Sequence, residues 1–139
     1  MSTSDKSMFQ FTGFKIIESH IIRDENLELS QDIKIGFNPR GKINRTENTY
    51  KILLGVIVKD ENDAFKANIE VIGYYKFPDA IEQDLLDKYF YTNAPAILFP
   101  YVRAYISTLT NLSGIDIITL PTLNLSALGG RLKENTTEV

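Results

Sequence analysis

The side chains that could carry acid–base, nucleophilic or metal chemistry are few and scattered in this sequence. His20 is the only histidine, and there is no cysteine. A metal centre or a catalytic triad needs several such groups brought together, and no spacing here suggests one. Neighbouring acids such as Asp24–Glu25 and Asp60–Glu61 fall in expected turns, where a solvated carboxylate is the ordinary state. The sequence therefore predicts no catalytic residue, no metal site and no cofactor.

Gly129–Gly130–Arg131 is a glycine-rich stretch that lacks the other elements of a phosphate-binding loop. We interpret it as a helix end, because glycine commonly terminates helices. A small-ligand or thioesterase-like enzyme, with a sheet wrapped around a helix, stays open as an alternative. Such folds place the long helix early, whereas here it follows the strands. A purely structural oligomer is a further alternative.

Composition limits the remaining classes. The 139 residues are 43% hydrophobic and 24% charged, which is typical of one globular domain. A net charge of -3 predicts no nucleic-acid partner. The first residues have no apolar segment of signal-peptide type, and no apolar run is long enough to enter a membrane. We expect a cytoplasmic protein with a mobile tail at 1–8, a single domain at 9–132 and a flexible tail at 133–139.

Alternating apolar residues predict strands in the first half of the chain. A β-branched and aromatic run begins at Phe9 and changes phase at Gly13, which indicates a bulge. A second strand covers 33–37, and 38–48 is expected to be a flexible crossing loop. Strands at 50–59 and 65–77, separated by the polar turn 60–63, predict an antiparallel hairpin.

Helical spacing replaces this alternation after Pro78. A short amphipathic helix is expected around Ile81–Tyr89, and the apolar stretch AILFPYVRAYISTL (96–109) predicts a longer one. Pro100 interrupts it, so the helix either begins at Pro100 or is kinked there. Leu125, Leu128 and Leu132 share one face of a last short helix. Strands followed by helices indicate an α+β fold.

The long helix offers two uncharged faces. Its apolar side would pack on the sheet, and Arg103 is its only charged residue. Ala104, Ser107, Thr108 and Asn111 are small and uncharged, whereas a helix of a monomer normally places charges toward solvent. This pattern favours contact with a second subunit over burial within the same chain.

Two stretches of the sequence resemble the SecB-type protein-export chaperones. Ala96–Arg103 (AILFPYVR) is close to that family's ILFPYxR signature at the start of its long helix. Leu120–Leu128 (LPTLNLSAL) is similar to the family's proline-containing segment and following helix start, although Leu125 and Ser126 depart from the usual aromatic residue and Asp. Phe9–Gln10–Phe11 and Glu70–Val71 fit in order.

The resemblance implies a four-stranded antiparallel sheet with a long helix in the C-terminal half packed behind it. It also implies a homotetramer, built as a dimer of dimers with the long helices at the centre. By similarity, the protein would be an ATP-independent holdase that binds unfolded preproteins and delivers them to the SecA motor. Members of the wider family guard an antitoxin in toxin–antitoxin systems, and the sequence leaves the two clients open.

Three sets of residues are expected to carry these contacts. The subunit interface would comprise Ala67, Ile69, Val71, Tyr101, Ala104, Tyr105, Ser107, Thr108 and Asn111. The motor-binding surface implied by the resemblance would comprise Glu18, Asn68 and Glu70. The client groove is expected among aromatic residues outside the strict core pattern, namely Phe37, Tyr74, Tyr75, Phe77, Tyr89, Phe90 and Tyr91.

Overall fold

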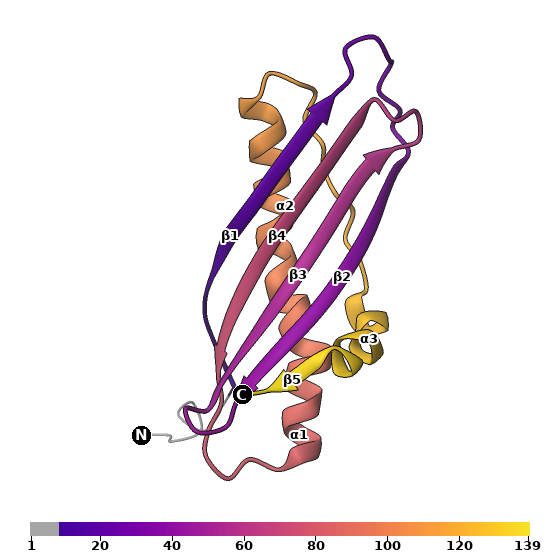
Figure 1. Cartoon of the computed structure of the whole chain (residues 1–139). Helices are drawn as coiled ribbons and strands as arrows, with labels where there is room; N and C mark the ends of the chain where they lie inside the picture. Colours follow the sequence, from indigo (N-terminus) through magenta and orange to yellow (C-terminus); the bar gives the residue numbers. More distant parts are fainter. Residues whose placement is uncertain (1–8) are drawn as a thin grey trace.

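A twisted sheet with one long helix across its back organises the chain in the computed structural model, which describes residues 9–139 (Figure 1). The long strands are β1 (Gln10–Arg23), β2 (Ile33–Asn44), β3 (Thr49–Asp60) and β4 (Phe65–Lys76). They are mutually antiparallel, and a short fifth strand, β5 (Thr136–Glu138), gives the order β1-β4-β3-β2-β5. The expected α+β fold with a four-stranded antiparallel sheet is confirmed, and β5 is an addition to it.

The central hairpin and the bulge are also confirmed. β3 and β4 pair from Thr49–Lys76 to Lys59–Lys66, around the polar turn. In β1, the register with β4 shifts between Phe11 and Gly13, and Gly13 has a φ of 145°, which favours glycine. A second register shift follows at Ile16/Glu18 and had no glycine to signal it.

The flexible loop expected at 38–48 is wrong over most of its length, because β2 continues to Asn44. Pro39 is tolerated there, since its carbonyl accepts a bond from the Asn135 side chain on the side of β2 that faces away from β3. The N and C=O of one strand residue point to the same side, so the missing N–H removes no bond of the β2–β3 ladder.

Most of the C-terminal residues, expected to be a flexible tail, form regular secondary structure. Lys133 and Glu134 end a short helix, and β5 pairs in parallel with Gly41–Ile43 of β2. Gly41 permits this approach: a Cβ there would lie 2.6 Å from the Thr136 hydroxyl and 2.8 Å from the Tyr50 hydroxyl. The N-terminal tail expected at 1–8 lies outside the described residues.

The long helix does not begin at Pro100. Helical backbone runs through α1 (Gln83–Lys88), a π-helical turn η2 (Tyr89–Asn93) and α2 (Ala94–Leu112). Pro95 is the second residue of α2, directly after the π-helical turn, and Pro100 lies inside the helix and is exposed. The helix therefore continues through Pro100, and the alternative that it begins there is wrong.

The core lies between α2 and the inner face of the sheet. From β3 and β4, alternate residues Ile52, Leu54, Val56, Ala67, Ile69 and Val71 are buried. They pack with Leu98, Val102 and Ile106 of α2. The Tyr75 hydroxyl donates a 2.7 Å bond to the Ala94 carbonyl and fixes the start of α2 on β4.

The last helix begins where the sequence suggested that it ends. A 3-10 turn, η3 (Leu125–Leu128), leads into α3 (Gly129–Glu134), so both glycines lie in the first turn of α3. Packing of Leu125, Leu128 and Leu132, all buried as expected, offsets the low helix propensity of glycine.

Candidate functional site

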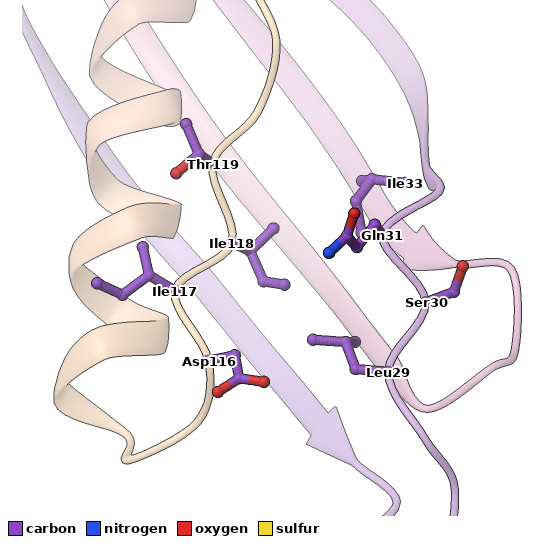
Figure 2. Close-up of a pocket in the computed structure, with 8 residues that line it drawn as sticks. All are labelled: Leu29, Ser30, Gln31, Ile33, Asp116, Ile117, Ile118 and Thr119. Carbon is purple, nitrogen blue, oxygen red and sulfur yellow. The ribbon is translucent and has the colours of Figure 1, made fainter.

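A long groove separates β2 from the chain that returns after α2. We call it the β2 groove. Its first part, a cavity of about 310 Å³, lies between residues 29–33 and 116–119. Figure 2 shows the side chains of Leu29 and Ile118 facing one another across it. A second cavity of about 340 Å³ continues from Ile33 along β2.

The second part of the groove is lined almost entirely by apolar side chains. Ile33, Ile35 and Phe37 form the sheet wall, and the opposite wall comprises Pro121, Leu123, Asn124, Leu125, Ala127 and Leu128. The strand part of this wall, Ile33–Phe37, extends about 13 Å at the rise of a β-strand, and Leu29–Gln31 continue the groove beyond it. The groove thus has the length and the apolar lining to hold an extended segment of several residues.

Polar side chains of α2 hold the far wall in place. The Thr110 hydroxyl accepts a 3.0 Å bond from the Ile118 N–H, and the Ser107 hydroxyl donates a 3.2 Å bond to the Ile118 carbonyl. Arg103 donates to the Thr122 hydroxyl over 3.2 Å. The wall has no strand partner, so the two bonds to Ile118 satisfy backbone groups that a ladder would otherwise pair.

The open edge of β2 is partly covered beside the groove. Arg131 donates a 2.6 Å bond to the Phe37 carbonyl, and Asn135 reaches the Pro39 carbonyl. β5 pairs only with Gly41–Ile43, so Ile33–Gly36 has no strand on this side. An unpaired strand edge can accept a further strand. The segment Ile33–Gly36 is such an edge, and it lies beside the apolar part of the groove.

Asp60 anchors the loop that forms the mouth of the groove. It is 1% exposed, and its carboxylate accepts bonds from the N–H groups of Ser30 (2.9 Å) and Phe65 (2.8 Å). Burial alone would raise the pKa of this carboxyl, but the surrounding backbone N–H groups more than offset it and hold the pKa below its ordinary value.

Asp60→Asn should lower the free energy of unfolding by about 1–3 kcal/mol at neutral pH, because the amide nitrogen cannot accept the Ser30 bond. A depressed pKa stabilises the fold above the unfolded-state pKa, and this stabilisation is lost as pH falls through the folded value. Denaturant titrations at several pH values should therefore show a shallower acid decline for the variant. Asp63→Asn, in the same turn, is the control and should match the wild type.

The predicted groove aromatics lie mostly elsewhere. Phe37 alone lines the β2 groove, whereas Tyr74 lies on the opposite face of the sheet beside Lys15 and Lys51. Tyr75, Phe77 and Phe90 are buried, so their expected role as client contacts is corrected. They form an aromatic cluster near η2, in which Phe90 stacks on Tyr50 with ring centroids 3.9 Å apart. Tyr89 and Tyr91 are half-buried at its rim.

The residues that line the groove were visible in the sequence only as strand or helix residues. Ile33 and Ile35 alternate with lysine and glycine, and Leu123, Leu125 and Leu128 suggested only a short helix. That the returning chain leaves a groove beside β2 depends on tertiary packing. No local pattern encodes that groove.

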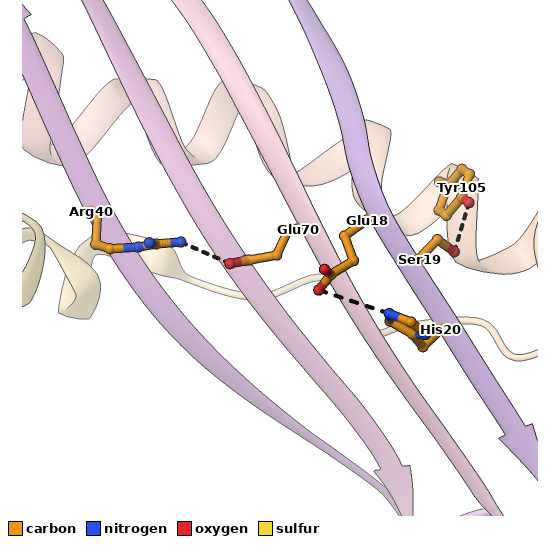
Figure 3. A network of polar contacts seen from close by, with 6 residues as sticks. All are labelled: Glu18, Ser19, His20, Arg40, Glu70 and Tyr105. Atoms are coloured by element: carbon orange, nitrogen blue, oxygen red, sulfur yellow. Dashed lines mark hydrogen bonds and ion pairs between the residues drawn. The ribbon is translucent and has the colours of Figure 1, made fainter.

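The expected interface residues divide between core and surface. Ala67, Ile69 and Val71 are at most 1% exposed within the single chain, so they are corrected to core residues. Ser107 holds Ile118, and Tyr105 donates a 2.8 Å bond to Ser19 on β1 (Figure 3). The remaining residues on α2 are exposed, namely Tyr101, Ala104, Thr108 and Asn111.

The expected motor-binding residues lie together on the outer face of the sheet. Glu18 and Glu70 are cross-strand neighbours, and Asn68 is opposite His20. Arg40 binds Glu70 over 2.7 Å, and Glu18 lies 3.9 Å from His20, as Figure 3 shows. A cation therefore already occupies one side of Glu70.

Two further features of residues 9–139 are the grouping of their potential metal ligands and the length and hydropathy of their helices. Within this part of the chain, no three His, Cys, Asp or Glu side chains are grouped to hold a metal ion. None of its helices is both long and apolar enough to cross a bilayer.

An antiparallel sheet backed by one long helix, with an apolar groove beside its edge strand, defines the class of this protein. The fold is that of the SecB-like chaperones. It resembles the solved structure of a SecB-like chaperone of Mycobacterium tuberculosis in complex with a ChAD peptide from an antitoxin, with a TM-score of 0.70. The sequence identity is 17%, and the match covers 87% of this chain and 91% of that one.

The chain belongs to the SecB family, because the model for preprotein translocase subunit SecB matches residues 14–134. An uncharacterized protein of Methanocaldococcus jannaschii is 27% identical to this chain. The match covers 96% of this chain and 90% of that protein. The protein-export protein SecB of Saccharophagus degradans is 33% identical over 99 residues, which are 68% of this chain and 58% of that protein.

Proposed function

We propose that this protein is an ATP-independent holdase that binds unfolded segments of other proteins in the β2 groove. The observation that carries the proposal is the apolar lining of Ile33–Phe37 facing Pro121–Leu128. Burying apolar side chains of a client there contributes roughly 25 cal/mol per Å² removed from water. Such binding requires no particular client sequence, which suits a holdase.

The direct test is an aggregation assay with a denatured secretory protein diluted into buffer. At stoichiometric chaperone and without ATP, light scattering should be suppressed. Unchanged aggregation would contradict the proposal. Turnover of an acyl thioester by the same preparation would instead favour the enzyme alternative.

We further propose that α2 carries the subunit interface. Its exposed residues Ile97, Tyr101, Ala104, Thr108 and Asn111 recur at alternating intervals of four and three, as in a helix–helix seam. The Phe14 ring lies 4.8 Å from Tyr101 and extends this surface onto β1, an edge strand. A second copy could cover both features, and two such dimers would give the tetramer implied by the resemblance.

Export is the client route that we favour, with the protein meeting preproteins in the cytoplasm and passing them to a SecA-type motor. The adjacent positions of Glu18, Asn68 and Glu70 support a contact surface there. A SecA binding measurement tests this route, and loss of binding in Glu18→Lys would support it. Binding of one antitoxin, and of no preprotein, would favour the toxin–antitoxin alternative.

A further inference from the structure

The outer face of the sheet, which is turned away from α2, collects much of the positive charge of the chain. In the cross-strand registers, eight of the 15 Lys and Arg residues lie on this face, against the two carboxylates Glu18 and Glu70. The whole chain has a net charge of -3, so acids dominate the other surfaces.

The charge is most concentrated near the β2–β3 turn. Three successive cross-strand rows there read Arg40–Leu53–Ile72–Lys15, Lys42–Lys51–Tyr74–Gly13 and Asn44–Thr49–Lys76–Gln10. These rows contain five cations and no carboxylate. We call the five residues the basic patch: Lys15, Arg40, Lys42, Lys51 and Lys76.

Within residues 9–139 the lysines of the patch have one carboxylate nearby, that of Glu47, which lines the same pocket as Lys51 and Lys76. None of the four lysines makes an ion pair there, and only Arg40 does, with Glu70. Lys42 and Lys51 are direct cross-strand neighbours, an arrangement that destabilises a sheet. The ammonium groups of Lys15 and Lys51 each lie 5.7 Å from the centroid of the Tyr74 ring. An anionic partner would relieve this repulsion.

The opposite end of the same face has more acidic residues beside its lysines. Lys34, Lys59 and Lys66 form a cross-strand row beside the acidic turns that contain Asp32, Glu61 and Asp63. The Glu61 N–H bonds the Asp32 carbonyl, which keeps these turns together at the end of the row. Three acidic residues therefore lie at the end of this row, although none of them forms an ion pair with its lysines.

The centre of the basic patch indicates what kind of anion it fits. Leu53 and Ile72 are half-buried between the cations, and Tyr74 is the only aromatic residue in the three rows. Binding of single-stranded nucleic acid relies on several stacked aromatic residues and on free Arg side chains. Here Arg40 is engaged by Glu70. Leu53 and Ile72 have Arg40 and Lys15 in their own row and Lys42 and Lys51 in the next one, which matches acidic residues interspersed with apolar ones.

We propose that the basic patch binds an acidic protein segment whose Asp and Glu residues alternate with apolar side chains. Its extent, about 15 Å in each direction from strand geometry, suits a short extended segment. The patch and the β2 groove lie on opposite faces of the sheet, so the segment and a client could be bound together. The proposal does not depend on the holdase function.

The test measures binding of a fluorescent 12-residue peptide of alternating Asp/Glu and Leu to the full chain by anisotropy. Neutralising three lysines (Lys15→Gln, Lys42→Gln and Lys51→Gln together) should weaken binding about tenfold, and salt should weaken binding to the wild type. The matched control is Lys34→Gln, Lys59→Gln and Lys66→Gln, which removes the same charge from the same face and should change binding less than about threefold.

Four outcomes would overturn the proposal. Equal weakening by the two triple variants would show a diffuse field and no patch. Equal binding of a peptide with Ser in place of Leu would remove the role of Leu53 and Ile72. Tighter binding of a single-stranded oligonucleotide of equal charge would identify a nucleic-acid surface. The groove variant Leu123→Asp should leave peptide binding unchanged, and loss of binding in that variant would place the peptide in the β2 groove.

Discussion

Leu123→Asp combined with Ala127→Glu is expected to abolish protection against aggregation at stoichiometric chaperone. Both residues line the apolar part of the β2 groove, and Ala127 is exposed there. A client side chain entering there would have to desolvate a carboxylate, which offsets the gain from burying its own apolar surface. We expect the client affinity to fall by at least about tenfold, that is by at least about 1.4 kcal/mol.

Ile57→Glu is the matched control for the groove variant. Ile57 is 46% exposed, and it lies on the outer face of the sheet, away from the groove. Protection by this variant should equal that of the wild type. Circular dichroism and thermal melts establish that each variant is folded. A folded groove variant that still suppresses scattering would show that clients bind elsewhere.

Ala104→Glu should split the proposed tetramer into dimers. Ala104 lies in the exposed series on α2 between Tyr101 and Thr108, where the helix of the proposed second subunit would leave room only for a small side chain. Burying an unpaired carboxylate there is costly, whereas the isolated chain leaves the position exposed to water. Sedimentation or light scattering should therefore report a halved mass with unchanged secondary structure.

Ala104→Ser is the control at the same position, since it adds a small polar atom and no charge. Its mass should remain that of the wild type. If Ala104→Glu also keeps the wild-type mass, the exposed face of α2 is not the seam between dimers. In that case the free edge of β1 becomes the next surface to test.

The elements that sequence reasoning predicted well are those specified by local pattern. Alternation defined the β3–β4 hairpin, and Gly13 marked the bulge in β1. The misses arise from partners remote in sequence. Pro39 and Gly41 carry loop signals, yet β2 continues through them because its other edge accepts Asn135 and β5. Likewise, Gly129 begins α3 because packing of Leu128 and Leu132 outweighs propensity.

The candidate site was less predictable for the same reason. Aromatic residues were expected in the groove, but Tyr75 and Phe90 are buried in the core, which needs large side chains to fill it. The net charge also gave no sign that the positive and negative residues are separated in space. Lysines at alternate strand positions lie on one face of the sheet, whereas the acids lie mostly in turns. Only the sheet order brings Lys42, Lys51 and Lys15 into one surface.

The pairing of β1 with β4 has a consequence for how the chain folds during its own synthesis. β1 is made first, but Arg23 pairs with Phe65, and Gln10 with Lys76. β2, β3 and β4 can assemble through adjacent hairpins, whereas β1 must close a much longer loop, which is entropically slower. Until β4 is complete, Phe11, Phe14 and Ile16 have no strand partner. The proposed chaperone thus passes through the same exposed, unpaired state from which it would protect its clients.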